Sequence, residues 1–149
     1  MMMRLTALAP AAFALLAACA GPPASPTAGP NPTPANPATA GQTFGKACVQ
    51  QLPSFAGTPA ALASNLFTRR ESSGIYYNNN ENISLRLTTT PTGTACAVTF
   101  GTNVARAQAV QAFGQAASAA APGAQADIAL DVGRGADGLL YFTATTRAQ

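Results

Sequence analysis

The sequence predicts an α+β domain in which a small antiparallel sheet carries helices on one face, with the element order α-α-β-β-β-α-β-β. Apolar residues recur at helical spacing after Phe44 and again in residues 102–120. Elsewhere they alternate with polar residues, as in strands, and Gly-, Pro- or Asn-rich turns separate the segments. Elements of these two kinds bury their apolar faces by packing helices onto a sheet.

The domain is expected to span residues 44–149 and to begin with a short helix. Phe44, Cys48 and Leu52 follow one another at four-residue spacing, so they share one helical face. Pro53 should end this helix, because proline has no backbone N–H and clashes with the preceding turn.

A second helix is expected from Thr58 to Arg70. Thr58 is a favourable N-cap residue, and Pro59 suits the first helical position. Arg69 and Arg70 would lie in the last turn, where positive charge is favourable. The expected buried stripe of this helix consists of Leu62, Ala63, Leu66 and Phe67.

Strands are expected in the middle of the domain. The segments "SGIYYNNN" and "NISLRLTT" lie on either side of an Asn-rich turn, and "ACAVTFG" follows after a second turn. In each of the last two segments, large apolar residues alternate with small or polar ones, which predicts one buried face. The residues expected on that face are Ile83, Leu85, Leu87, Cys96, Val98 and Phe100.

A third helix and two further strands complete the prediction. The helix should span residues 102–120, with Val110, Phe113 and Ala117 on its buried side. The segment "DIALDV" then alternates again, and a Gly-rich turn leads into the last strand, "LLYFTAT". The residues expected to point inward from "DIALDV" are Ile128, Leu130 and Val132.

The composition excludes several classes of function. The chain has no histidine, which removes His-based catalytic triads and His-ligated zinc or haem. Charged residues make up 9% of the chain, and the net charge of +3 comes from scattered residues. A nucleic-acid-binding protein needs a concentrated basic face. We therefore expect no nucleic-acid partner, no cofactor and no bound metal.

Residues 1–18 have the layout of a secretory signal peptide. Arg4 precedes an apolar stretch, and small residues follow in "MMMRLTALAPAAFALLAAC". The alternative is a transmembrane helix, but the stretch is shorter than the roughly 20 residues that span a bilayer. Pro10 would also interrupt the hydrogen bonding of such a helix.

The end of this leader resembles the lipobox of bacterial lipoproteins. Leu16-Ala17-Ala18-Cys19 has the order aliphatic, small, small, cysteine. The resemblance covers the leader alone, and it implies cleavage before Cys19, diacylglycerol on the sulfur and an acyl chain such as palmitate on the new amino group. It also implies a cell-envelope location. Ala20 stands where an aspartate typically retains lipoproteins at the inner membrane, which favours the outer membrane. The alternative is an ordinary signal peptide with an incidental cysteine.

Residues 19–43 are expected to form a disordered tether after the lipidated Cys19. The stretch from Ala20 to Thr43 has seven prolines and no charged or aromatic residue. Such a composition cannot bury enough apolar surface to offset the entropy of ordering. As polyproline II it would hold the domain up to roughly 75 Å from the membrane. A proline-rich docking ligand is the alternative.

Cys48 and Cys96 are expected to form a disulfide. They are the two cysteines that remain in an oxidising compartment if Cys19 is lipidated. Both fall on predicted inward faces. The alternatives are two buried free thiols, or a redox or metal pair without the usual C-x-x-C motif.

One short stretch has the composition that is typical of a binding loop. Tyrosine and asparagine give adaptable contact area, and they cluster at Tyr76, Tyr77, Asn78, Asn79 and Asn80. The alternative for this stretch is a solvated hairpin turn.

Another short segment, "GRGADG", matches a dinucleotide-binding pattern by letter. A strand follows where that fold needs a helix, so we expect a hairpin loop there.

The predicted function is that of a non-enzymatic, lipid-anchored envelope protein that acts by binding or by structural support. Its partner would be an envelope protein or a cell-wall component. The alternative is a small periplasmic hydrolase that uses carboxylates. Glu71 and Glu81 are the only glutamates in the chain.

Overall fold

The computed structural model describes residues 33–62 and 66–148. Within them it has three α-helices, a short 3-10 turn and six strands, consistent with the predicted α+β class. The helices are α1 (Pro37–Ala47), α2 (Thr58–Leu62) and α3 (Arg106–Ala120), and the 3-10 turn is Val49–Gln51. The strands are β1 (Phe67–Arg70), β2 (Ile75–Asn78), β3 (Ile83–Thr90), β4 (Gly93–Thr102), β5 (Ile128–Arg134) and β6 (Leu140–Arg147).

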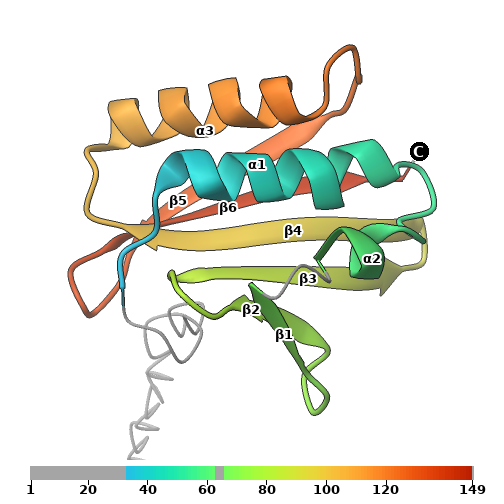
Figure 1. Cartoon of the computed structure of the whole chain (residues 1–149), viewed down its shortest axis with the longest axis horizontal. Coiled ribbons are helices and arrows are strands. Elements are labelled where there is room, and N and C mark those ends of the chain that lie inside the picture. The colour runs from blue at the N-terminus through green and yellow to red at the C-terminus, as the bar shows by residue number, and fades with distance from the viewer. Residues whose placement is uncertain (1–32, 63–65, 149) are drawn as a thin grey trace, which may run out of the picture.

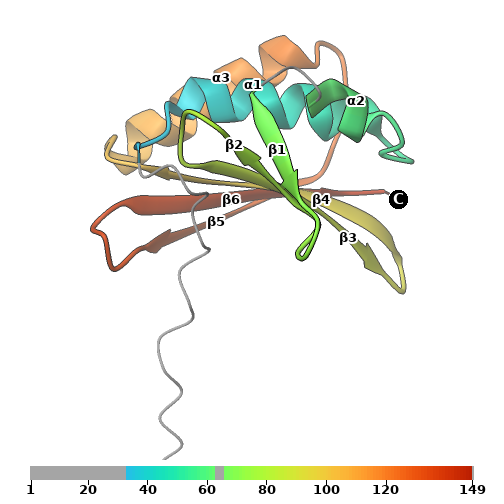
Figure 2. The ribbon, with the colours of Figure 1, turned by 60° about the horizontal axis from the view of Figure 1, so that its bottom comes forward.

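The strands form one antiparallel sheet in the order β1-β2-β3-β4-β6-β5. The long strands β3, β4 and β6 occupy the middle, and β1 and β5 lie at the two edges. Helices α1 and α3 lie side by side over one face of this sheet (Figures 1 and 2). The predicted arrangement, with helices on one face, is therefore confirmed.

Aromatic rings connect the sheet to the helices. The register places Phe100 of β4 opposite Phe142 of β6, and their ring centroids are 5.0 Å apart. Phe113 of α3 stacks on Phe100 at 5.4 Å and contacts Phe44 of α1 at 5.6 Å. Because all four rings are buried, they form a continuous core from the middle of the sheet to both helices.

The two long helices approach each other through glycines of α1. A Cβ atom added at Gly45 would lie 2.7 Å from the Ala117 carbonyl oxygen, and one at Gly41 would collide with the Phe113 carbonyl oxygen. Glycine at these positions, four residues apart, lets the backbones approach to a distance that no larger residue permits. This contact explains why an alanine-rich helix such as α3 packs well: small residues meet small residues.

The predicted boundary between tether and domain at Phe44 is wrong, because residues 37–43 belong to α1. Pro37 occupies the first helical position, and the side chain of Asn36 accepts a hydrogen bond from the Ala38 N–H at 2.9 Å. Upstream, the Ala35 N–H donates to the Gly101 carbonyl at 2.7 Å. Gly41, which lies in the segment expected to be disordered, is one of the two glycines that the close helix contact requires. Residues 20–32 of the predicted tether, Cys19 and the leader lie outside the described residues.

The predicted second helix is also too long. Helix α2 ends at Leu62, and Phe67 to Arg70 form strand β1 instead of a last helical turn. Strand pairing determines the conformation of this segment, because β1 lies antiparallel to β2 with Phe67 opposite Asn78. Leu66, expected in a buried stripe, is 44% exposed, and Ala63 lies outside the described residues.

Helix α3 starts later than predicted. Thr102 ends β4, and the helix begins at Arg106. Its buried residues are Ala109, Phe113 and Ala117, whereas Val110 is 37% exposed. The prediction that Val110 lies on the buried side of the helix is therefore wrong. Its neighbour Ala109 is buried instead, and its small side chain lets the helix approach the core more closely.

The glycine contact gives a stability prediction with an internal control. Gly41→Ala should lower the free energy of unfolding by about 1–3 kcal/mol, because the added methyl meets the α3 backbone. Gly114→Ala, on the exposed side of α3 with nothing within 4 Å, should raise it by about 0.5–1 kcal/mol. Urea unfolding of both variants measures this, and equal effects would contradict the close contact.

Candidate functional site

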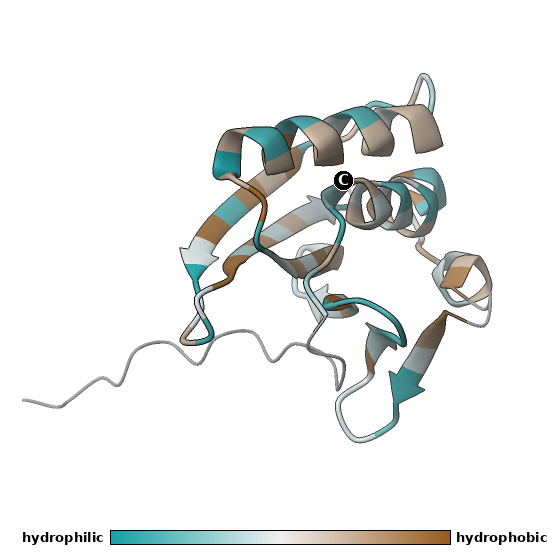
Figure 3. Cartoon of the chain, turned by 60° about the vertical axis from the view of Figure 1, so that its left-hand side comes forward, coloured by the Kyte–Doolittle hydropathy of each residue, from teal (hydrophilic) through white to brown (hydrophobic). Residues whose placement is uncertain are grey.

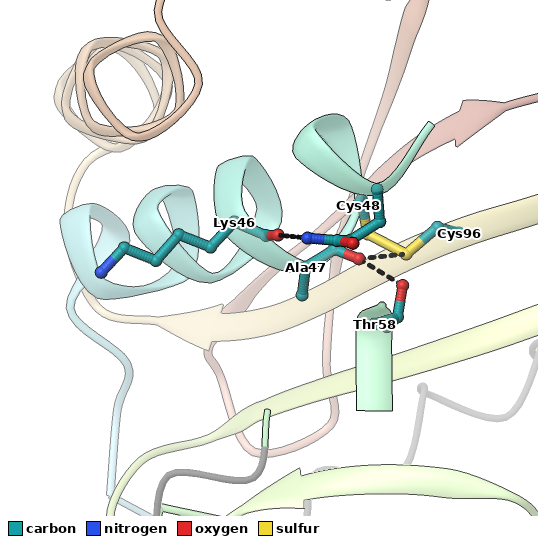
Figure 4. The surroundings of a disulfide bond; sticks show 6 residues. Lys46, Ala47, Cys48, Thr58 and Cys96 are labelled. Carbon is teal, nitrogen blue, oxygen red and sulfur yellow. Dashed lines mark hydrogen bonds between the residues drawn. A yellow bond between two sulfur atoms is a disulfide. The ribbon is translucent and has the colours of Figure 1, made fainter. Parts of the chain in front are cut away.

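The predicted disulfide between Cys48 and Cys96 is present. The two Cα atoms are 5.6 Å apart, inside the range that a disulfide spans. Cys48 follows the last residue of α1, and Cys96 lies on the helix-facing side of β4 (Figure 4). Both cysteines are fully buried. The bond therefore fastens the C-terminal end of α1 to the middle of the sheet.

A buried threonine supports this junction. The Thr58 hydroxyl donates a hydrogen bond of 2.6 Å to the Ala47 carbonyl, one of the carbonyls left unpaired at the end of α1 (Figure 4). The sequence predicted Thr58 as an N-cap of its own helix. Instead its side chain joins the start of α2 to the end of α1, so three segments meet at the disulfide.

The predicted Tyr/Asn binding stretch divides into structural and accessible parts. Tyr76, Tyr77 and Asn78 belong to β2, and Asn79 and Asn80 start the loop to β3. Tyr77 and Asn78 are buried, whereas Asn79 and Asn80 are exposed and Tyr76 is half-buried.

The asparagines of this stretch mainly hold the loop in shape. The Asn78 side-chain oxygen accepts hydrogen bonds from the N–H groups of Asn80 and Glu81, at 2.8 and 3.0 Å. The Asn79 side-chain oxygen accepts a hydrogen bond of 2.9 Å from the Thr68 hydroxyl of β1. Such local bonds are the usual role of asparagine in turns. Asn80 and Tyr76 are therefore the members of the stretch best placed to contact a partner.

Two arginine–tyrosine pairs on the same hairpin were not predicted from the sequence. The guanidinium carbon of Arg69 lies 6.0 Å from the centre of the Tyr76 ring, and that of Arg70 lies 5.3 Å from the centre of the Tyr77 ring. These are cation–π distances. Both arginines are exposed, and because neighbouring residues of a strand point to opposite sides, the hairpin carries one pair on each face.

A sequence signal for this hairpin exists. Two short segments, "FTRR" and "IYYN", flank the turn residues "ESSG", and Gly74 has a positive φ of 66°. This pattern contradicts the predicted helix that ends at Arg69 and Arg70.

A second polar cluster lies at the end of the sheet where the chain enters the domain. The Asn82 side-chain amide donates to the Tyr141 hydroxyl at 3.1 Å, and this hydroxyl donates to Asp137 at 2.6 Å. Asp137 also accepts from the Leu139 N–H at 3.1 Å. The segment "GRGADG" thus forms the end of β5 and most of the predicted hairpin loop to β6, and its aspartate holds a buried tyrosine of β6.

The hydrogen bond from Tyr141 lowers the pKa of Asp137 below its usual range. Burial, and secondly the hydrogen bond to Asp137, raise the pKa of Tyr141. Both shifts favour the state with an ionised carboxylate and a neutral phenol. The cluster of Asn82, Tyr141 and Asp137 therefore has a structural role at ordinary pH, and we call it the clasp.

The two glutamates do not form a carboxylate pair. Glu71 lies in the turn before β2, and Glu81 lies in the loop after it, so they are at opposite ends of this strand. Glu81 accepts a hydrogen bond of 3.0 Å from the Asn36 N–H at the start of α1. No group of three or more potential metal-ligating side chains occurs among the described residues.

Comparison with known proteins gives no assignment. No family model, no curated protein and no solved structure matches the chain. Within residues 33–62 and 66–148, no helix has the length and apolar character needed to cross a membrane.

Removing the disulfide should destabilise the domain strongly. Cys48→Ser or Cys96→Ser should lower the free energy of unfolding by about 2–5 kcal/mol, because the bond closes a loop across 48 positions of the chain. Thiol labelling of the unfolded, unreduced protein tests the bond itself. Uptake of label by both Cys48 and Cys96 would show that it does not form.

The clasp should make stability depend on pH at both extremes. Asp137 stabilises the fold above the pKa of an unfolded aspartate, and this contribution is lost as the pH falls through its lowered folded pKa. Tyr141 contributes below the unfolded tyrosine pKa of about 10, and this contribution is lost as the pH rises through its raised folded pKa.

Ultraviolet titration can isolate Tyr141 as the difference between wild type and Tyr141→Phe. In Asp137→Asn the Tyr141 phenol should ionise at lower pH than in wild type, because the carboxylate acceptor is gone. An unchanged titration would contradict the hydrogen bond.

Proposed function

We propose that the chain is a lipid-anchored protein of the bacterial cell envelope that acts by binding rather than by catalysis. The lipobox-like Leu16-Ala17-Ala18-Cys19 and the proline-rich segment after it support the anchor and the tether. The Cys48–Cys96 disulfide supports export, because disulfides persist in oxidising compartments.

The binding site is the β1–β2 hairpin, and the observation that carries it is its two arginine–tyrosine pairs. Arginine loses side-chain entropy when it binds, and stacking on a ring reduces that loss by ordering it beforehand. Arg69 and Arg70 therefore present oriented guanidinium groups on a short edge strand with exposed side chains.

The chemistry of the hairpin defines the kind of partner. A guanidinium group binds carboxylate or phosphate through paired hydrogen bonds. The partner is thus an envelope protein or cell-wall component that carries acidic groups. Tyr76 extends the contact beside Arg69, and the exposed Asn80 lies beyond the other end of β2.

Lipidation has a direct test. Cys19→Ser should move the protein from the membrane fraction to the soluble fraction, because the attachment point of the acyl chains is removed. Mass spectrometry of the wild-type N-terminus should find an acylated Cys19. An unmodified N-terminus at another residue would contradict the anchor.

Binding through the hairpin is tested by crosslinking in intact cells and by co-sedimentation with purified cell wall. Arg69→Ala together with Arg70→Ala should weaken binding at least about tenfold, the equivalent of 1.4 kcal/mol. The matched control is Arg106→Ala together with Arg147→Ala, which removes the same charge from two exposed arginines outside the hairpin and should bind like wild type. Equal loss in both variants would reduce the effect to net charge and contradict the site.

A further inference from the structure

Strand β5 is an unprotected edge of the sheet. It pairs with β6 on one side, and no strand in the described part of the chain pairs with its other side. It runs for seven residues without a proline. Its outer N–H and C=O groups are therefore a template for a further strand.

An apolar groove follows this edge on the helix side. It lies between α3 and β5, has a volume of about 250 Å³, and has no charged residue in its lining. Val110 and Phe113 of α3 and Ile128 and Leu130 of β5 contribute to it. Figure 3 shows β5 beneath α3 with alternating hydrophobic and hydrophilic bands along the strand.

The groove leaves apolar side chains in contact with water. Ile128 is 48% exposed and Val110 is 37% exposed, although Ile128 faces the helix side of the sheet. The third large hydrophobic residue that is exposed in the described part, Leu66, lies next to β1 at the opposite edge. The apolar layer under α3 is thus incomplete on the side of β5.

We propose that a second copy of this chain completes the layer, with the two β5 strands paired antiparallel about a two-fold axis at Leu130. A two-fold axis normal to the sheet keeps the helix side of both copies on the same side. Leu130 then faces its counterpart, and Ile128 faces Val132 of the second copy. Each exposed Ile128 gains an apolar neighbour without any change of fold.

Charge selects this register over its neighbours. A centre at Asp131 would place two carboxylates opposite each other, and a centre at Ala129 would place Asp127 opposite Asp131 of the second copy, twice. Like charges directly opposite are destabilising. A centre at Val132 would place Arg134 opposite Leu130 and move Ile128 away from Val132. With the centre at Leu130, Asp131 faces Ala129, and the helix-side pairs Leu130–Leu130 and Ile128–Val132 are apolar.

The residues on the helix-free side of β5 are also compatible with this pairing. Ala129 and Gly133 are small, and Asp131 points to the helix-free side of the sheet, where it does not enter the apolar layer. The twofold arrangement extends the sheet from one copy into the other and places both α3 helices above the seam.

Sedimentation of the full-length protein in detergent tests the dimer. Wild type should be dimeric, and Ile128→Lys should be monomeric at the same concentration. Leu66→Lys, a similarly exposed hydrophobic at the other edge, should remain dimeric. All three share the same N-terminal segment before the domain, so association through that segment would leave their masses alike, and this outcome would overturn the proposal. Circular dichroism checks that Ile128→Lys is folded.

A cysteine at the proposed axis tests the register. Leu130→Cys should form an interchain disulfide under mild oxidation, because it faces its own counterpart, whereas Gly133→Cys, which faces Asp127 of the second copy, should form much less. Equal crosslinking of both variants would overturn the register. A monomeric wild type that takes up an apolar dye in the groove would assign the groove to a small ligand and overturn the dimer.

Discussion

The close contact between α1 and α3 is the constraint on which the rest of the molecule depends. Gly41 and Gly45 let the backbone of α1 reach the carbonyls of Phe113 and Ala117 on α3. With the helices that close, the Phe44 and Phe113 rings meet and extend the aromatic core down to the sheet. The core contains few large residues, so the short distance between the helices supplies the packing that side-chain volume does not.

The same constraint explains which parts of the fold could be predicted from the sequence. Alternation placed Ile83, Leu85 and Val98 correctly in the core, because a strand with one buried face has a period of two. The Cys48–Cys96 bond was predicted because these two cysteines remain if Cys19 is lipidated and both fall on expected inward faces. The start of α1 could not be predicted, since alanine, glycine and proline are typical of linkers unless another helix lies near enough to pack on them.

The candidate site, like the fold, could be predicted from the sequence only in part. The Tyr/Asn stretch was recognised by composition, but the arginines beside it were not, because residues 67–70 become a strand only through pairing with β2. Composition also could not distinguish Asn78, whose side chain holds the loop, from the exposed Asn80. Whether a polar residue of a loop serves the loop or the surface depends on hydrogen bonds that form only in the folded chain.

The way in which the N-terminal segment is attached to the domain has a mechanical consequence. The backbone just before α1 is bonded to the end of β4 at Gly101, and α1 is then joined covalently to β4 at Cys96. A pull on the N-terminal side would thus load the central strand at two points, Gly101 near its end and Cys96. The β1–β2 hairpin lies two strands away from β4. If a partner held the hairpin, tension would cross the β3–β4 and β2–β3 ladders and leave β5, β6 and α3 outside the path of the force.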